Sequence, residues 1–179
     1  GDVYKRQEGL RDAQVGAAVK HYPGLGAVSG NTDFTTEGIL DTTTTLDGAE
    51  AGAFDQAITK TDPAMVMMSL ATYQSIDPNN PAVFSSTIID GHIRNALKYT
   101  GVVISDSMSA EALSSYDVSQ LGVKLVEAGG DMSCIGQTDY VKPIVDGLNE
   151  RAKSDPAFAS KVTAAATRVM ALKIKMGLA

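Results

Sequence analysis

The chain has 179 residues, about the length of one domain, and its 44% hydrophobic and 20% charged residues are typical of a folded globular protein. A formal net charge of -6 is opposite in sign to that of most nucleic-acid-binding proteins, so we predict no nucleic-acid partner. Cys134 is the only cysteine, which excludes an internal disulfide, and with two histidines no metal centre is expected. No apolar run approaches the roughly 20 residues of a membrane span.

The N-terminal segment carries little structural signal. Residues 1–7 ("GDVYKRQ") are polar and unpatterned and lack a starting methionine, so a non-native origin of this segment stays open. No signal peptide is evident, and the cellular compartment stays open too. We predict that residues 9–17 ("GLRDAQVGA") form a helix that leads into the first strand.

Four short apolar runs predict strands buried on both faces, because each is strand-length and lacks the alternation of a half-exposed strand. They span residues 17–22, 64–69, 101–106 and 131–136. Helical patterns with apolar faces or end signals fill the intervals and follow the last run. These predicted helices span residues 49–61, 85–99, 119–130 and 155–177.

This alternation predicts an α/β fold with a parallel sheet and helical crossovers, in one domain over residues 1–179. Two architectures stay open: a doubly wound sheet, or part of a (β/α)₈ barrel of the TIM type. A full barrel needs about 250 residues and eight strand–helix units. Because the chain supplies about four units, a barrel fold would make it half of one.

In parallel α/β folds the chemistry gathers at the carboxyl ends of the strands. Lys20 and His21 end the first run and Asp106 ends the third, so we expect all three at that rim. A long polar loop after the second run, residues 69–82, is expected at the same rim. Asp131 opens the fourth run and is expected at the opposite rim.

The glycine-rich loop "GLGAVSG" (residues 24–30) does not predict a nucleotide site. Its spacing misses the dinucleotide fingerprint, no helix opens behind it, and the P-loop lysine is absent. The loop is therefore either an ordinary turn or a flap that places Asp33 near a ligand.

Asp106 has two interpretations. "DSMSAEALSS" (residues 106–115) resembles a helix start, which would make Asp106 a helix N-cap. Alternatively, Asp106 and Asp33 form a carboxylate pair that, with the cation of Lys20 and the imidazole of His21, suits glycoside hydrolysis. His21 as a hydrogen-bonded structural residue also stays open.

Four motifs in order make the chain similar to glycoside hydrolase family 3, and within it to the β-N-acetylhexosaminidase branch. They are "VKHYPGLGAVSGNTD", "VMMSLATYQSIDPNNPAVFS", "LKYTGVVISDSMS" and "AGGDM". The resemblance covers residues 17–136. It implies a (β/α)₈ barrel, of which the four runs would be strands five to eight, with the N-terminal half missing from this chain.

The resemblance also implies a retaining mechanism through a covalent glycosyl-enzyme, without a cofactor. The aspartate of "ISD" is the nucleophile, which corresponds to Asp106, and the Lys-His pair that contacts the sugar corresponds to Lys20 and His21. The implied substrate is a carbohydrate with β-linked N-acetylglucosamine, such as a peptidoglycan fragment. A β-glucosidase or β-xylosidase on the same scaffold is the alternative enzyme.

Two positions depart from the family pattern. Where the hexosaminidase branch has Asp-Ser-His in a mobile loop, this chain has Asn31-Thr32-Asp33, so a carboxylate replaces the general acid/base histidine. Asp33 either takes that role or leaves a sugar-binding protein without catalysis. Ser107 stands where many relatives have a second aspartate. For the two remaining residues of interest, we expect His92 to face solvent or to pack within a helix, and Cys134 to lie in the core.

Overall fold

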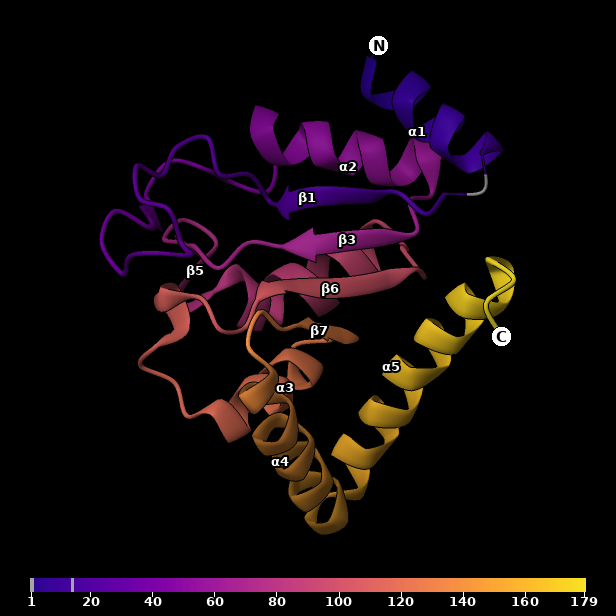
Figure 1. Cartoon of the computed structure of the whole chain (residues 1–179). Helices are drawn as coiled ribbons and strands as arrows, with labels where there is room; N and C mark the ends of the chain where they lie inside the picture. The colour runs from indigo at the N-terminus through magenta and orange to yellow at the C-terminus, as the bar shows by residue number, and fades with distance from the viewer. Residues whose placement is uncertain (1, 14) are drawn as a thin grey trace.

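The computed structural model describes residues 2–13 and 15–179 (Figure 1). Its strands are β1 (Ala18–Tyr22), β2 (Leu40–Asp41), β3 (Met65–Met68), β4 (Thr72–Tyr73), β5 (Asp77–Pro81), β6 (Val102–Ser107) and β7 (Met132–Cys134). Its α-helices are α1 (Asp2–Asp12), α2 (Ala49–Thr61), α3 (Val118–Glu127), α4 (Val141–Ser154) and α5 (Pro156–Lys175). Four further helical segments are η1 (Ala82–Phe84), η2 (Thr87–Ala96), η3 (Glu111–Leu113) and η4 (Thr138–Tyr140); η2 is a π-helix and the others are 3₁₀ turns.

The main sheet has four parallel strands in the order β1-β3-β6-β7. Spatial order follows chain order throughout, with a helix in each crossover. A doubly wound sheet reverses its order at a switch point, whereas a barrel adds each strand beside the last. The sheet is therefore of the (β/α)₈ barrel type, and the four predicted strands are confirmed at these positions.

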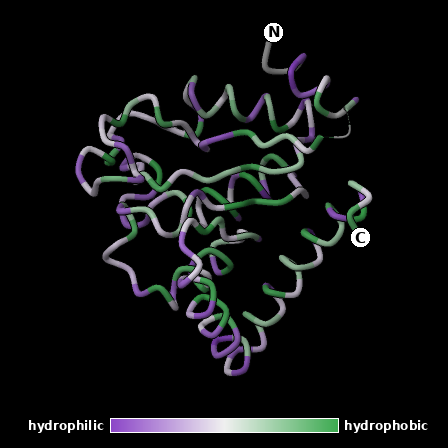
Figure 2. Tube along the Cα trace, viewed as in Figure 1, coloured by the Kyte–Doolittle hydropathy of each residue, from purple (hydrophilic) through white to green (hydrophobic). Residues whose placement is uncertain are grey.

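One face of this sheet is fully covered. Val66, Met68 and Val103 have no exposed surface and pack with apolar side chains of the crossover helices. Those side chains are Ile58 of α2, Ile88, Ile89 and Ile93 of η2, and Leu121 and Leu125 of α3. In Figure 2, β3 and β6 are coloured as hydrophobic over most of their length.

The other face of the sheet is only partly covered. Met67 pairs with Ile104, and Ile104 pairs with Met132, so the three side chains form an apolar row across β3, β6 and β7. All three are half-buried. The prediction that these strands are buried on both faces is therefore wrong for this chain, although their sequences are apolar on both.

Helices 49–61, 85–99, 119–130 and 155–177 are confirmed within a few residues as α2, η2, α3 and α5. Asp155 caps α5 by accepting hydrogen bonds from the backbone N–H groups of Ala157 and Phe158, and Pro156 occupies its first turn. The "TTTT" segment at residues 42–45 has no regular secondary structure.

Three predictions of local structure need correction. The helix before β1 is α1, which covers residues 2–12 rather than 9–17; its polar sequence has no clear apolar face to locate it. No helix begins at Asp106, because β6 continues to Ser107 and only the short η3 follows. Finally, α4 was not predicted, since Pro143 in its first turn resembles a loop signal although proline fits there.

Asp131 lies at the amino ends of the strands, as expected, just before β7. Its side chain is completely buried and forms ion pairs with Arg94 of η2 and Arg168 of α5. It also accepts a hydrogen bond from the backbone N–H of Val103, at 2.8 Å. This carboxylate therefore ties two helices to the sheet at the rim opposite Asp106. Among the described residues, no helix is long and apolar enough to cross a membrane.

Candidate active site

The centre of the candidate site is a contact between two strands of the main sheet. His21 in β1 and Asp106 in β6 are separated by β3, yet His21 Nε2 lies 3.3 Å from Asp106 Oδ2. The two side chains keep 23% and 19% of their surface exposed, so a ligand can reach them. The other carboxylate oxygen, Asp106 Oδ1, accepts a hydrogen bond from the Ser107 backbone N–H at 2.8 Å. Asp106 is thus fixed by a strand, not by a helix end.

The pKa of His21 depends on its burial and on the charges of Asp106, Lys20 and Asp33. Burial lowers the pKa of His21 below 6.5, and the positive charge of Lys20 lowers it further. The carboxylates of Asp106 and Asp33 act in the opposite direction and raise it. The net lowering makes His21 predominantly neutral at pH 7. Lys20 itself is exposed on β1, beside His21.

Asp33 lies on a loop that we call the flap, residues 29–38. The ends of the flap meet, because the backbone N–H groups of Ser29 and Gly30 both donate to the Gly38 carbonyl, at 3.0 and 2.9 Å. At the tip, the Asp33 N–H donates to Asn31 Oδ1 at 2.9 Å. Residues 31–33 therefore do form the turn that their sequence allows.

The flap is docked onto the loop that follows Asp106. The backbone N–H of Glu111 donates to the Asp33 carbonyl at 3.2 Å, and that of Ala112 donates to the Thr32 carbonyl at 3.1 Å. Thr32 is buried, with 5% of its surface exposed. A segment that leaves β1 is thereby held against η3, across the carboxyl ends of the strands, at the left of Figure 1.

A second, small sheet anchors the two segments that flank the flap, which we call its roots: Gly24 on the N-terminal side and Asp41 on the C-terminal side. Its order is β2-β4-β5, and β4 and β5 lie in the polar loop predicted to be irregular after β3. The hydroxyl of Tyr73 in β4 donates to the carbonyl oxygen of Gly24, where the flap leaves β1. At the other root, buried Asp41 of β2 accepts hydrogen bonds from Thr43 and Thr44. Burial alone would raise the pKa of Asp41, but these hydrogen bonds lower it.

The chain matches the family model described as the glycosyl hydrolase family 3 N-terminal domain over residues 3–172. It belongs to glycosyl hydrolase family 3.

Solved structures of family members superimpose well. The β-N-acetylhexosaminidase from Beutenbergia cavernae DSM 12333 is 36% identical with a TM-score of 0.86, over 93% of this chain and 49% of that one. The family 3 β-N-acetylglucosaminidase from Paenibacillus sp. str. FPU-7 is 28% identical with a TM-score of 0.85, over 98% of this chain and 34% of that one.

Among curated relatives, a β-hexosaminidase from Alkalilimnicola ehrlichii is 34% identical over 125 residues, which are 69% of this chain and 35% of that protein. The β-hexosaminidase LpqI from Mycobacterium tuberculosis is 29% identical over 175 residues, 93% of this chain and 44% of LpqI. The family 3 chain described here therefore spans less than half the length of these relatives.

The family 3 chain has two serines beside Asp106, of which only Ser107 was singled out from the sequence. Ser107 Oγ lies 3.1 Å from Ser109 Oγ, which accepts a hydrogen bond from the Gly136 N–H. Asp41 and Tyr73 were missed as flap anchors, because their roles depend on contacts with residues far away in the chain, which local sequence patterns do not show. Among the described residues, no cluster of three or more His, Cys, Asp or Glu side chains could hold a metal ion.

Two predictions outside the site have different outcomes. His92 packs in η2 as one alternative expected; its Nε2 lies 2.8 Å from Asp55 Oδ2, and Asp55 also accepts a hydrogen bond from the Tyr22 hydroxyl. Cys134 is only half-buried, so its prediction as a core residue is wrong. The strand that carries Cys134, β7, is an outer strand of the main sheet in the described part of the chain.

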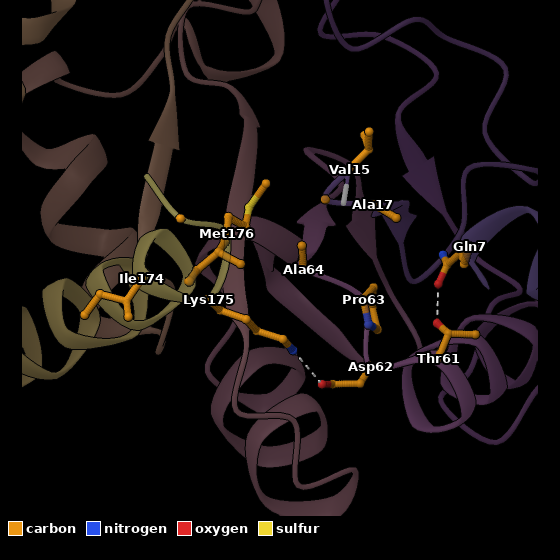
Figure 3. Close-up of a pocket in the computed structure, with 13 residues that line it drawn as sticks. Gln7, Val15, Ala17, Thr61, Asp62, Pro63, Ala64, Ile174, Lys175 and Met176 are labelled. Carbon is orange, nitrogen blue, oxygen red and sulfur yellow. Dashed lines mark hydrogen bonds and ion pairs between the residues drawn. The ribbon is translucent and has the colours of Figure 1, made fainter. Parts of the chain in front are cut away.

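A pocket of about 490 Å³ lies far from Asp106, at the amino ends of β1 and β3 (Figure 3). It is lined by Ala17 and Ala64, which precede those strands, and by the end of α5 around Met176. Lys175 of α5 pairs with Asp62 across its edge, at 3.3 Å. The pocket is separate from the candidate site, because the carboxyl ends of parallel strands lie at the opposite rim.

Proposed function

We propose that this chain carries the catalytic rim of a retaining glycoside hydrolase that removes β-linked N-acetylglucosamine. The observation that carries the proposal is the contact of His21 with Asp106 at the carboxyl ends of parallel strands, beside a docked flap that bears Asp33. Relatives named β-hexosaminidase and β-N-acetylglucosaminidase support the same substrate class. Fragments of peptidoglycan contain such a sugar.

In the proposed mechanism Asp106 is the nucleophile. Its carboxylate oxygen attacks the anomeric carbon, the bond to the glycosidic oxygen breaks, and Asp33 gives that oxygen a proton. Asp33, now ionised, then takes a proton from water, and the resulting hydroxide displaces Asp106 from the sugar. Two inversions retain the configuration. Neither step requires a metal or an organic cofactor.

The surroundings of Asp106 suit a nucleophile. It stands on a strand whose neighbours are held by backbone pairing, and the Ser107 N–H fixes one of its oxygens. Neutral His21 leaves the carboxylate without an adjacent full positive charge that would weaken its attack. We expect Lys20 and His21 to bind hydroxyl groups of the sugar as hydrogen-bond donors.

We further propose that residues 1–179 are the second half of a barrel domain, completed by an N-terminal half. Three features support this: relatives about twice as long, free outer edges at β1 and β7, and the half-exposed apolar row of Met67, Ile104 and Met132. The inner face of a closed barrel is filled by such side chains. The missing half would contribute further sugar-binding groups.

The runner-up enzyme is a β-glucosidase or β-xylosidase, which differs in whether the pocket accepts an N-acetyl group. A non-catalytic sugar-binding protein is the rival from another class. The observation that favours the rival is Asn31-Thr32-Asp33, where the hexosaminidase branch carries a histidine.

The test uses the full gene product with its upstream sequence. Nitrophenol release is compared between the β-N-acetylglucosaminide and the β-glucoside for wild type, Asp106→Ala and Asp33→Asn. A matched control is Asp146→Asn, which alters an exposed carboxylate on α4. We expect activity on the N-acetylated substrate, its loss in Asp106→Ala, and recovery of that variant by azide as a glycosyl azide.

Activity on the glucoside alone would favour the runner-up. Turnover that persists in Asp106→Ala would contradict the assignment of the nucleophile. Saturable binding of N-acetylglucosamine by a folded wild type without any turnover would favour the binding protein. Full activity of Asp33→Asn would contradict the assignment of Asp33 as the general acid/base.

A further inference from the structure

We infer that Phe34 is a specificity-determining residue for the leaving group: its ring forms an apolar platform on which the sugar or aromatic ring beyond the scissile oxygen stacks. The inference rests on the proposed function, because it uses the role of Asp33 to locate the leaving group. It adds a recognition element for the part of the substrate that departs, rather than for the sugar that is retained.

The first support is exposure. Phe34 keeps 80% of its surface exposed, and among the described side chains it is the only aromatic one that is exposed. The other described aromatic residues are buried or half-buried, for example Tyr22, Phe84 and Phe158 in the core. A phenyl ring at this exposure contributes little to folding and costs solubility. The ring is therefore accessible to a ligand.

The second support is that hydrogen bonds fix the backbone at and before Phe34. Its N–H donates to the Asn31 carbonyl at 3.0 Å, and the two residues before it are bonded to η3 through the Thr32 and Asp33 carbonyls. Thr32 is buried at the docking contact. An exposed ring on a fixed backbone loses less conformational entropy on binding than one on a loose loop.

The third support is position along the chain. Phe34 directly follows Asp33, whose proposed partner is the glycosidic oxygen. The group attached to the far side of that oxygen is the leaving group, so the flap tip lies on the leaving-group side of the bond. A β-linked pyranose presents flat faces of C–H groups, which pack on an aromatic ring, and an aryl group stacks on it directly. The ligand class is therefore a β-linked sugar or aryl leaving group.

The experiment compares two substrates that differ only beyond the scissile oxygen: methyl β-N-acetylglucosaminide, whose methyl group cannot stack, and N,N′-diacetylchitobiose. The variants of the full gene product are Phe34→Ala, Phe34→Tyr and Phe34→Leu. We expect Phe34→Ala to lower kcat/KM for chitobiose about five- to tenfold relative to the methyl glycoside, the size of one aromatic contact. Phe34→Tyr should recover it, whereas Phe34→Leu, apolar but not flat, should not.

A control variant is Val145→Ala, which trims an exposed apolar side chain on α4, 47% exposed and on a different face. This substitution should leave kcat/KM unchanged for both substrates. An equal fall on both substrates in Phe34→Ala would show a general effect on the flap and would overturn the inference. Unchanged kinetics on both would overturn it as well.

A binding measurement separates this inference from the proposed function. If the wild type hydrolyses nothing, calorimetry with chitobiose and with N-acetylglucosamine still tests the platform. If Phe34→Ala weakens binding of the disaccharide but not of N-acetylglucosamine, Phe34 acts as the platform in a non-catalytic protein. Equal affinities of wild type and Phe34→Ala for the disaccharide would reject it.

Discussion

The hydroxyl of Tyr73 donates a hydrogen bond to the backbone carbonyl of Gly24, and this bond joins the small sheet to the root of the flap. Tyr73 has no exposed surface, so its hydroxyl has no water to replace this partner. Both roots of the flap are thereby anchored in the segment after β3: Gly24 through Tyr73, and Asp41 through the pairing of β2 with β4. The position of Asp33 depends on these anchors.

Tyr73→Phe should destabilise the fold by about 1–3 kcal/mol, because the Gly24 carbonyl loses its buried donor. It should also loosen the flap, so that a glutamate-specific protease cuts faster at Glu37. The matched control is Tyr99→Phe, whose hydroxyl donates to the Pro63 carbonyl at the opposite rim, at 2.8 Å. The control should lose similar stability in urea denaturation without faster cleavage at Glu37; faster cleavage in both variants would refute the anchoring role.

His21 should make stability depend on pH. Burial lowers its pKa in the folded state below 6.5, so the unfolded chain binds this proton at a higher pH than the folded chain. Its contribution to stability is therefore complete above pH 6.5 and declines as the pH falls below that value toward the folded-state pKa. His21→Gln removes the titration. The loss of unfolding free energy between about pH 7.5 and 5.5 should be smaller in His21→Gln than in wild type. An identical loss in both would contradict the assignment.

Asp131→Asn should destabilise the protein by about 3 kcal/mol or more, because a completely buried carboxylate is lost while Arg94 and Arg168 keep their charges. The matched control is Asp146→Asn, which removes an exposed carboxylate paired with Lys142 and should cost about 0.5 kcal/mol at most. Urea titration of both variants measures the difference. Comparable midpoints for the two would show that the buried pairs add no stability.

Alanine substitutions at two helical glycines should change the stability of the fold in opposite directions. In Gly147→Ala the new Cβ would stand 1.9 Å from the Ser119 carbonyl oxygen, so α3 and α4 must separate, at a cost of about 2 kcal/mol. In Gly52→Ala no atom lies within 4 Å of the new Cβ, and helix α2 should gain about 0.5–1 kcal/mol. Thermal melts should therefore move in opposite directions. A lower melting temperature for Gly52→Ala would contradict the structure of α2.

The 179-residue chain by itself should associate or aggregate. Its outer strands β1 and β7 have free edges, and Met67, Ile104 and Met132 leave an apolar row half-exposed. Light scattering of the purified chain should show dimers or larger species, and co-expression with the upstream segment should yield a single stable complex. A sharp, reversible melt of a monomer would contradict this prediction.

The sequence by itself determined the four strands of the main sheet, most of the helices, and the rim at which Lys20, His21 and Asp106 lie. These features depend on short-range signals: apolar runs, caps such as Asp155, and the rule that parallel strands end at one rim. The family motifs in order also identified the family. The polar sequences of α1 and the proline of α4 gave misleading signals, so those helices were misplaced or missed.

Only the tertiary structure decided that His21 contacts Asp106 across an intervening strand, and that the flap docks on η3. Both depend on residues far apart in the chain, whose distance is set by sheet register and by the bonds of Tyr73 and Asp41. Local patterns carry no information on such pairings, because their free energy arises from packing and hydrogen bonds that exist only once the sheet has formed.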